Sequence, residues 1–317
     1  MKVSPIQPAP ISVVRRQFSK SNSHFDEHAV VFTTVGKRLL ERLDLLAAMP
    51  STVLDLGCRS GYQLQALAQR YPSATIIGAD PAPGTSGNEP VGYSNGLVLR
   101  GLGRGIRQLL GWRGSGGFGL HRVACDPHTL PFADDSFDLV ISNLFLPWCE
   151  QPFEVFKEVS RILSPDGAFL FTSAGPDTLT EYRTIWSGID TYPHIFGLID
   201  MHDLGDSMLA AGFAAPVLDR ENLHVDYPDF SALESELRLL GAANVAAGRR
   251  RGLMASDVGA RLRDSVGAAE RFSVTFELIN GHGWKGELVP QGQNSSEGFA
   301  MPVDKLRKTL KKSSYNR

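Results

Sequence analysis

The sequence is poor in cysteine and has almost no net charge. Its 317 residues include three cysteines, Cys58, Cys125 and Cys149, which are far apart and form no C-x-x-C pair. A disulfide framework and a structural zinc site are therefore not expected, no metal site is predicted, and a reducing compartment fits this cysteine usage. The formal net charge of −2 gives no whole-chain electrostatic argument for binding nucleic acid.

Long apolar runs are also missing. No stretch approaches the roughly 18–20 apolar residues that cross a bilayer, and the N-terminus lacks the apolar centre of a secretory signal. We therefore expect no membrane association. Residues 1–25 are basic without an acidic residue, as in organelle transit peptides, but their three prolines argue against the helix that such peptides form. A cytoplasmic protein is the default interpretation.

What the sequence does contain is a regular alternation of strand-like and helix-like segments. Short apolar runs predict buried parallel strands at 52–56, 74–80, 120–125, 137–142 and 168–172. Helical periodicity predicts helices near 30–47, 62–70 and 150–163. This alternation predicts an α/β fold, a Rossmann-like and mostly parallel sheet with right-handed crossovers, preceded by N-terminal helices.

The expected domain organisation is one large domain between two polar ends. Residues 1–10 are predicted to be disordered, 11–285 to form the domain, and 286–317 to be a polar, basic tail. Within the domain, a ligand-binding core is expected over 51–175. The glycine- and serine-rich segment 83–119 interrupts this core and is too long for an ordinary connection.

The second half of the domain is expected to be mostly helical. Residues 176–265 carry helical periodicity, with one strand predicted near 215–219. The segment 272–279 alternates between apolar and polar residues and is predicted to form an antiparallel strand at the edge of the sheet.

A glycine-bearing turn after the first predicted strand carries the first functional signal. In the run 53–61, a buried strand reaches Asp55, turns on glycine and enters a helix. Gly57 allows the backbone to turn sharply, and Gly61 allows the start of the helix to lie close to a ligand. A plain strand-to-helix turn has the same appearance, so this segment alone does not decide between the two.

Acidic residues at the ends of the next two strands add to this signal. Asp80 ends the second strand, where a carboxylate can accept hydrogen bonds from both hydroxyls of a ribose. Asp126 follows the third strand and can accept from an adenine amino group. The G-x-G-x-x-G order of a dinucleotide site is missing, so a nucleoside without phosphate fits better. Together with Asp55, these acids suit a ligand with several donors and a positive sulfonium.

These segments resemble the class I S-adenosylmethionine methyltransferases over about 51–175. The run Asp55-Leu56-Gly57-Cys58-x-x-Gly61 is similar to their first motif, and Asp80 to their ribose-binding acid. The runs that resemble the fourth-strand signature and the turn before strand five are Leu130-Pro131-Phe132-x-x-x-Ser136-Phe137-Asp138-Leu139-Val140, then Ser142-Asn143, and Leu163-x-Pro165-x-Gly167. The resemblance implies S-adenosyl-L-methionine as cofactor, with Asp55, Gly57, Arg59, Gly61, Asp80, Asp126 and Asn143 as the candidate binding residues.

Arg59 departs from the family pattern, which usually has glycine at this position of the turn. Its side chain must either point away from the methionine part of the cofactor or contact the methionine carboxylate. If Arg59 instead disables cofactor binding, the chain would be an assembly or scaffold protein with a degenerate methyltransferase fold.

Segments beyond the core resemble the BioC family, the malonyl-acyl-carrier-protein O-methyltransferases of biotin synthesis. With them the resemblance spans roughly 12–284. The segments are Phe25-Asp26-Glu27-His28-Ala29, Gly175-Pro176-Asp177-Thr178-Leu179-x-Glu181-x-Arg183, Gly241-Ala242-x-Asn244 and Gly248-Arg249-Arg250-Arg251-Gly252-Leu253. Assembly factors of respiratory complex I share the Asp-Thr-Leu segment, but the last two segments favour BioC. The resemblance implies a malonyl group on acyl-carrier protein as methyl acceptor; another small-molecule or protein acceptor is the alternative.

The chemistry of such an acceptor indicates which residues to look for. A malonyl carboxylate is ionised at neutral pH and needs no general base, but it needs orientation, desolvation and a positive partner. Arg183 and the cluster 249–251 are the candidate partners, and the cluster could instead dock the acidic carrier protein. Asn143 and Trp148, which follow the fourth strand, complete the predicted catalytic set, although Trp148 suits a core position equally well.

Overall fold

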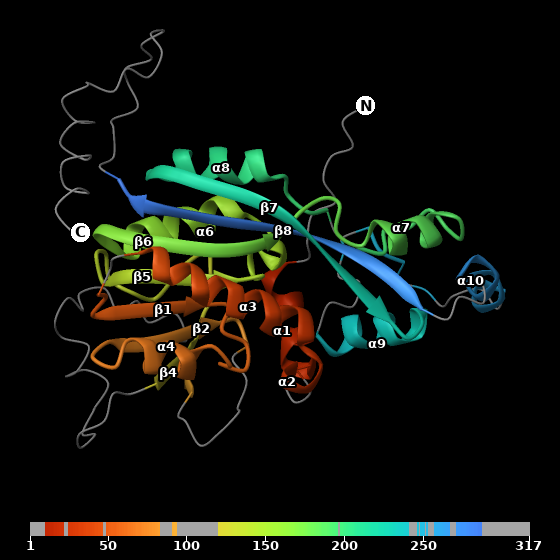
Figure 1. Ribbon diagram of the computed structural model, residues 1–317, viewed down its shortest axis with the longest axis horizontal. Helices are drawn as coiled ribbons and strands as arrows, with labels where there is room; N and C mark the ends of the chain where they lie inside the picture. Colours follow the sequence, from red (N-terminus) through yellow and green to blue (C-terminus); the bar gives the residue numbers. More distant parts are fainter. Residues whose placement is uncertain are drawn as a thin grey trace, which may run out of the picture. The chain divides into compact units, whose positions relative to one another are not determined.

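An eight-stranded sheet organises the part of the chain that the computed structural model describes (Figure 1). The described residues are 10–21, 25–46, 49–82, 91–93, 120–195, 197–240, 246, 248–250, 252, 257–266 and 271–286. The chain divides into two units, 1–287 and 288–317, and every described residue belongs to the first. Most of the long 83–119 segment and the tail from 287 onward lie outside the described residues, so the expectations for them stay predictions.

The sheet is mostly parallel, as the alternation of segments predicts. In spatial order its strands are β3 (Val91–Tyr93), β4 (Leu120–Ala124), β2 (Thr75–Asp80), β1 (Thr52–Leu56), β5 (Phe137–Asn143), β6 (Leu163–Ala174), β8 (Phe272–Lys285) and β7 (Phe213–Tyr227). Neighbours from β3 to β6 are parallel, whereas β8 runs antiparallel to β6 and β7. The strand order reverses between β1 and β5, and open α/β sheets bind ligands outside the carboxyl ends of the strands at such a point.

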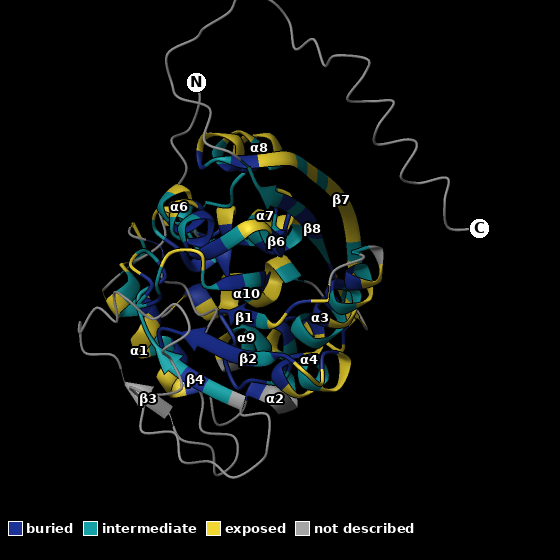
Figure 2. Ribbon diagram, turned by 90° about the vertical axis from the view of Figure 1, so that its left-hand side faces the viewer, coloured by how far each residue is buried: buried dark blue, intermediate teal, exposed yellow. Residues whose placement is uncertain are grey.

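Helices cover both faces of this sheet. In chain order the described helices are α1 (Ile11–Ser21), α2 (Phe25–His28), α3 (Val30–Arg42), η1 (Leu43–Leu45), α4 (Leu64–Arg70), η2 (Leu146–Trp148), α6 (Pro152–Ile162), α7 (Thr180–Ser187), α8 (Met201–Ala210), α9 (Phe230–Leu239) and α10 (Val258–Val266). On one face, α3 and α4 share an apolar cluster with Val53 of β1. On the other face, α1, α6 and α8 share a cluster with Leu54. Successive residues of β1 thus point to opposite faces of the sheet, and both Val53 and Leu54 are buried. Figure 2 shows the central strands in the colour of buried residues.

Helices α7, α9 and α10 pack against the far halves of β7 and β8 (Figure 1). Trp186 of α7, Leu233 of α9 and Val258 of α10 form an apolar cluster with Tyr227 of β7 and Val274 of β8. The second half of the domain therefore shares a core with the two antiparallel strands, and these strands connect it to the parallel sheet.

Two expectations about the antiparallel strands are wrong. The 176–265 region, expected to be mostly helical with one strand near 215–219, contains the fifteen-residue strand β7. The strand expected over 272–279 extends to Lys285, and it lies between β6 and β7 rather than at the edge of the sheet. β7 is the edge strand and most of its residues are exposed or half-buried, so only its last part, 223–227, shows the apolar and polar alternation by which a strand is recognised in a sequence.

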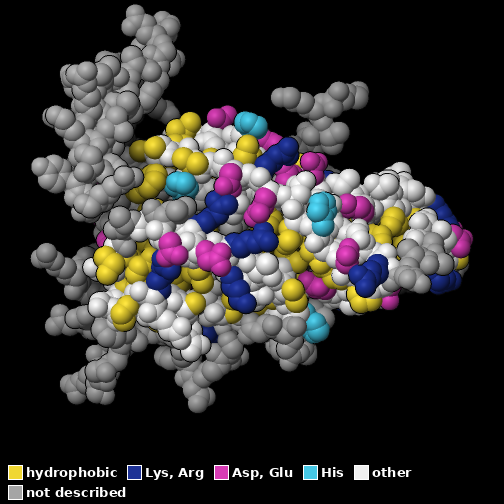
Figure 3. All heavy atoms as spheres, in the orientation of Figure 1, with side chains coloured by type: hydrophobic (Ala, Val, Ile, Leu, Met, Phe, Trp, Pro, Cys, Tyr) yellow, Lys and Arg dark blue, Asp and Glu magenta, His cyan; other side chains and the backbone are white. Residues whose placement is uncertain are grey.

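Charged side chains cover the exposed edge formed by β7. Arg38 and Arg42 of α3 donate to Glu221 at 3.0 Å and to Asp219 at 2.8 Å, respectively. Figure 3 shows basic and acidic side chains intermixed on this face of the molecule. Because such charges discourage pairing with a strand of another chain, they protect the edge from aggregation.

Within the described ranges, no helix is both long and apolar enough to cross a membrane. The same part of the chain brings together no group of three or more His, Cys, Asp or Glu that could hold a metal ion. All three cysteines are free thiols.

Candidate active site

The turn between β1 and α4 is built around two glycines that no other residue could replace without strain. Gly57 has a φ of +85°, and a Cβ there would lie 2.3 Å from the ring of Phe145. Gly61 has a φ of +83°, and a Cβ there would lie 2.4 Å from the guanidinium of Arg122. The amide of Gly57 donates to the carbonyl of Ala79 at 2.7 Å. The turn is therefore fixed against the end of β2.

Asp55 is a buried acid that accepts no hydrogen bond within the described part of the chain, although the charge of Arg122 acts on it. It lies in β1 between Gly78 of β2 and Ile141 of β5, with 1% of its surface exposed. Neither carboxylate oxygen accepts a hydrogen bond from a described residue. Burial, followed by the charge of Asp80, raises the pKa of Asp55 to about 7. A bound cation or hydrogen-bond donor would relieve this unsatisfied charge, as S-adenosylmethionine can.

Asp80 is fully buried at the end of β2. One of its oxygens accepts from the amide of Arg59 at 3.1 Å and the other from the amide of Ala82 at 2.7 Å. Burial raises the pKa of Asp80, and the Arg59 charge and the two amides oppose that change. The carboxylate is thus oriented by backbone donors beside the turn, the position that the sequence assigns to a ribose-binding acid.

The side chain of Arg59 crosses from the turn to the N-terminal helices. Its backbone has a φ of 52°, in the left-handed region that favours glycine. Its guanidinium carbon lies 3.5 Å from the centre of the Phe18 ring and 4.5 Å from that of Phe25. Nη2 donates to Ser21 Oγ at 3.0 Å and to the Leu240 carbonyl at 2.9 Å. Burial lowers the pKa of Arg59 to about 10, so it stays charged at neutral pH.

Asp126 lies just beyond β4, where the sequence places it. Its carboxylate accepts from the amide of His128 at 2.9 Å and contacts the His128 ring at 2.7 Å. The hydrogen bond to His128 lowers the pKa of Asp126, so the acid is ionised at neutral pH. Asp126, Asp80 and Asp55 thus belong to three adjacent strands of the sheet, β4, β2 and β1.

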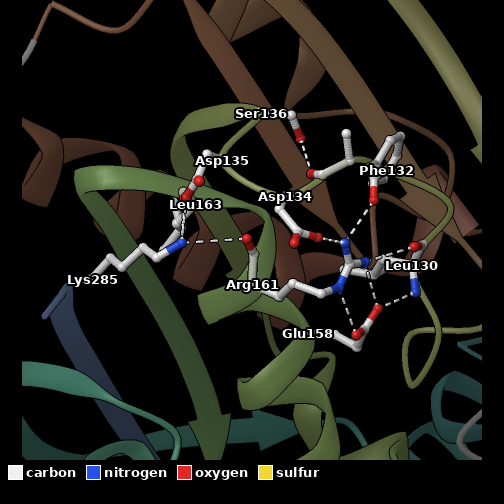
Figure 4. Close-up of polar contacts among 10 residues, drawn as sticks. Leu130, Phe132, Asp134, Asp135, Ser136, Glu158, Arg161, Leu163 and Lys285 are labelled. Carbon is white, nitrogen blue, oxygen red and sulfur yellow. Dashed lines mark hydrogen bonds and ion pairs between the residues drawn. The ribbon is translucent and has the colours of Figure 1, made fainter. Parts of the chain in front are cut away.

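Arg161 of α6 holds the loop that follows Asp126 (Figure 4). Its guanidinium donates to the carbonyls of Leu130 and Phe132 at 3.0 and 2.8 Å and to Glu158 and Asp134 at 2.8 Å each. Glu158 in turn accepts from the amide of Leu130 at 2.7 Å. One side chain therefore fixes the path of the loop after β4 against α6.

Asn143 fixes the end of β5 through hydrogen bonds to neighbouring elements. Its amide oxygen accepts from Thr172 Oγ1 at 2.7 Å, and its amide nitrogen donates to the Phe32 carbonyl at 2.9 Å and to the Tyr62 hydroxyl. The contacts join β5 to β6 and to α3. A role of Asn143 in cofactor binding or catalysis stays a prediction.

A cavity of about 230 Å³ opens beside these strand ends. It is lined by Val31, Phe32, Leu144, Pro147, Trp148, Ala174, Thr178, Leu179, Tyr182, His194, Ile195, Leu198, Tyr227, Glu234, Glu236, Leu237, Arg238, Leu240, Phe276 and Leu278. Trp148 is thus a cavity residue, whereas its neighbour Phe145 is buried against Gly57. The walls come from the loops after β5 and β6, from α3, α7 and α9, and from β7 and β8.

Three charged residues of α9 in this cavity were missed by the sequence analysis. Glu234 accepts from the Tyr182 hydroxyl at 3.4 Å, and Glu236 has one buried oxygen without a described partner. Burial is the main cause that raises the pKa of both carboxyls. Arg238 is exposed and also lines the cavity, so it lies at the opening. The i, i+4 spacing of Glu234 and Arg238 is visible in the sequence, but it is typical of a solvated helix face.

The other predicted acceptor-binding residues lie elsewhere. Arg183 donates to the Pro176 carbonyl and, at 3.2 Å, to Thr180 Oγ1, and it is not among the cavity-lining residues. Arg249 donates to the Ala246 carbonyl at 3.1 Å. The guanidinium of Arg250 lies 5.7 Å from the centre of the Tyr192 ring, whereas Arg251 lies outside the described residues.

Glu277 of β8 fixes the loop after β6 that forms one wall of the cavity. Its carboxylate accepts from the amide of Asp177 at 2.7 Å and from Arg220 of β7 at 3.1 Å. Its backbone also accepts from the amide of Gly175 at 2.8 Å. The buried acid therefore joins the loop to both antiparallel strands.

Comparisons with known proteins find relatives of this chain. A family described as "Methyltransferase domain" matches residues 54–171. A malonyl-[acyl-carrier protein] O-methyltransferase of Methylovorus sp. is 37% identical over 86% of this chain and 88% of its own length. Relatives of the same name from Gallionella capsiferriformans and Halorhodospira halophila are 36% and 35% identical, over 86% and 93% of this chain and 90% and 95% of their own lengths. Among solved structures, the YcgJ protein from Bacillus subtilis aligns at a TM-score of 0.49 and 17% identity, over 79% of this chain and 99% of that chain.

Proposed function

Because this chain belongs to the malonyl-[acyl-carrier protein] O-methyltransferase family, we propose that it transfers a methyl group from S-adenosylmethionine to the free carboxylate of a malonyl group on acyl-carrier protein. This is an early step of biotin synthesis. The observation that carries the proposal is the position of the cavity: three of its wall residues, Leu144, Trp148 and Ala174, follow or end β5 and β6. The acceptor cavity therefore opens at the same sheet edge as the glycine turn.

The cofactor half of the site is supplied by the turn and the strand ends. Asp80 is the ribose acceptor, Asp126 the acceptor for the adenine amino group, and Asp55 the buried negative charge near the cationic part of the cofactor. Gly57 and Gly61 give the turn its left-handed backbone and let Phe145 and Arg122 pack against it. When bound, S-adenosylmethionine supplies an electrophilic methyl group on a positively charged sulfur.

The acceptor needs no general base. A new bond forms between a carboxylate oxygen and the methyl carbon, the bond between that carbon and sulfur breaks, and both of its electrons stay on sulfur. No proton moves, so the protein contributes orientation and exclusion of water. The mostly apolar cavity walls, with Trp148 beside the strand ends, provide both.

Two arginines are candidates for the positive partner of the malonyl carboxylate. Arg183 is the one that the sequence indicates, and Arg238 is the one that lines the cavity. Glu234 and Glu236 are hydrogen-bond acceptors in the same cavity. They suit the amide N–H groups of the long thioester arm that carries the malonyl group.

We propose that this enzyme works in the cytoplasm. We also propose that the carrier protein docks near the 249–251 cluster. A basic cluster steers an acidic partner toward its surface. Arg250 lies over Tyr192, which is two residues before the cavity residue His194, so this arginine is near a cavity wall.

The direct test is a product assay with the purified chain, S-adenosylmethionine and malonyl-acyl-carrier protein. Mass spectrometry should find one added methyl group on the malonyl carrier and none on an acetyl carrier, which lacks the free carboxylate. The gene should also restore biotin-independent growth to a strain that lacks this step. If the malonyl carrier stays unmodified while the chain binds the cofactor, the acceptor is another molecule and this proposal is wrong.

A further inference from the structure

Arg59 is a buried cation whose hydrogen bonds are incomplete. The residue is 3% exposed, and the rings of Phe18 and Phe25 pack against its guanidinium. Nη2 has two acceptors, Ser21 Oγ and the Leu240 carbonyl. Nη1 has no hydrogen-bond partner among the described residues. A buried charged donor left without an acceptor is costly, so its retention points to a ligand acceptor.

The guanidinium lies where the two halves of the proposed site meet. On one side, the backbone of Arg59 belongs to the glycine turn and donates to Asp80. On the other side, its acceptor Leu240 lines the cavity. Its stacking partner Phe18 packs edge to face on the cavity residue Trp148, with ring centres 5.2 Å apart. A ligand group held by Nη1 would therefore be close to both reactants.

The surroundings of Arg59 select an anion of a particular shape. Two aromatic faces and two neutral oxygens fix the plane of the guanidinium, so the free Nη1 has a fixed direction. The acid whose charge acts on this guanidinium is Asp80, which itself accepts from the backbone amides of Arg59 and Ala82. One planar oxyanion completes this arrangement, since guanidinium and carboxylate are matched in geometry.

We propose that Arg59 binds a carboxylate of the reactants through Nη1, and that Phe18, Phe25, Ser21 and Leu240 hold its guanidinium in place for that purpose. The inference rests on the proposed function, in which both reactants carry such a group: the methionine part of the cofactor and the malonyl part of the acceptor. Arg59 is then a ligand-binding residue of the site, and the strained backbone that it requires is retained for this contact.

The test is calorimetry with two cofactor forms that differ only in the carboxylate, S-adenosylmethionine and decarboxylated S-adenosylmethionine. The variants are Arg59→Met, which keeps an apolar chain between the rings, and Arg59→Lys, which keeps the charge. Arg16→Met is the matched control, because Arg16 is an exposed arginine of α1. Melting temperatures of all proteins identify any variant that does not fold.

If Arg59 binds the cofactor carboxylate, Arg59→Met should weaken S-adenosylmethionine about tenfold to a hundredfold. The decarboxylated form should bind the wild type and Arg59→Met almost equally, and Arg59→Lys should retain part of the preference. Arg16→Met should keep the full preference for the carboxylate form.

If Arg59 binds the acceptor carboxylate instead, Arg59→Met should leave both cofactor affinities unchanged and lower kcat/KM for malonyl-acyl-carrier protein by a similar factor. Equal weakening of both cofactor forms, or no change in any of these quantities, would show that Arg59 is only structural and would overturn the inference. A wild-type chain that binds no cofactor would contradict the proposed function itself, a different outcome.

Discussion

At the scale of single residues, the site is marked by polar groups that the protein leaves unsatisfied. Asp55 has two buried oxygens without a described partner, and Arg59 and Glu236 have one such atom each. Proteins satisfy nearly all buried polar atoms, so such atoms are candidates for ligand contacts. Asp55 and Arg59 lie in or beside the glycine turn and Glu236 lines the cavity, whereas a further orphaned atom, Trp186 Nε1, belongs to α7. The same atoms lower the stability of the ligand-free chain.

Asp55 gives the first prediction, which concerns pH. Its pKa is about 7 in the folded chain and near the ordinary value of 3.8 when unfolded. Between these values the folded state holds a proton that the unfolded state has lost. The free energy of unfolding therefore falls as pH rises from 4 to 7, by on the order of 4 kcal/mol, and is then level.

Replacing this acid removes the effect. Asp55→Asn should stabilise the ligand-free chain at pH 8 by roughly 1–3 kcal/mol, less than the full effect because a buried amide is also unsatisfied. The gain should vanish near pH 4, and cofactor affinity should fall. Urea unfolding across this pH range measures the effect. Asp138→Asn is the control, because Asp138 already accepts from the amide of Ser51 at 2.7 Å and its loss should destabilise.

Arg238 and Arg183 give a second prediction at this scale. If the positive partner of the acceptor lines the cavity, Arg238→Met should lower kcat/KM for the malonyl carrier about tenfold to a hundredfold. Cofactor affinity should not change. Arg183→Met should then have a small effect, because its guanidinium is engaged by Pro176 and Thr180. Steady-state kinetics of both variants decide between them; a large loss only in Arg183→Met would support the sequence-based assignment.

At the scale of elements, loops are fixed by single side chains that reach across from a neighbouring element. Arg161 of α6 fixes the loop after β4, and Glu277 of β8 fixes the loop after β6. Loops at strand ends carry the ligand contacts of α/β proteins, and their backbone groups need partners once they leave the sheet. Each fixing residue is thus outside the site but determines the position of a site loop.

Arg161 provides the prediction that belongs to this scale. Arg161→Met removes hydrogen bonds to two carbonyls and two acids. It also leaves the partly buried carboxylate of Glu158 without the positive charge that pairs with it. We expect a loss of about 2–4 kcal/mol in the free energy of unfolding and weaker cofactor binding through Asp126. Lys157→Met on the same helix breaks an exposed ion pair and a contact with the half-exposed Phe153 ring, and it should cost less than about 1 kcal/mol. Equal losses in the two variants would contradict the role of Arg161.

At the scale of the whole molecule, a parallel half supplies the glycine turn and an antiparallel half with its helices supplies most of the cavity. β8 joins the two, because it pairs with β6 on one side and β7 on the other.

The last prediction concerns the partner that must reach this cavity. Arg249→Ala with Arg250→Ala should raise KM for the malonyl carrier severalfold and reduce its dependence on salt, since exposed charges act over about 8–10 Å.

The measurement is KM for the carrier-bound acceptor between low and physiological ionic strength. Arg261→Ala with Arg263→Ala is a control with the same change in charge on α10. If both double variants behave alike, the carrier does not recognise the 249–251 cluster in particular. If neither changes KM, docking relies on another surface.

The parallel core was predictable from the sequence, and the residues that we propose for the cofactor half of the site were chosen from the sequence as well. Each of these signals is contained in one short segment: an apolar run, a glycine turn, or an acid at the end of a strand. Asp55, Gly57, Gly61, Asp80 and Asp126 could be chosen because parallel strands bring their carboxyl ends to one edge. No knowledge of distant contacts was needed for them.

The direction of the Arg59 side chain, the cavity, and the length and order of the antiparallel strands follow from the three-dimensional structure alone. The guanidinium of Arg59 is held by Ser21 and Leu240, which are 38 and 181 positions away in the chain. The helical spacing of Glu234 indicates a solvated residue, whereas the structure places it beside Tyr182. Most of β7 is polar because it lies at the edge of the sheet, so its full length is not visible in the sequence. Such features depend on contacts between remote segments, and the local periodicity of a sequence carries no record of those contacts.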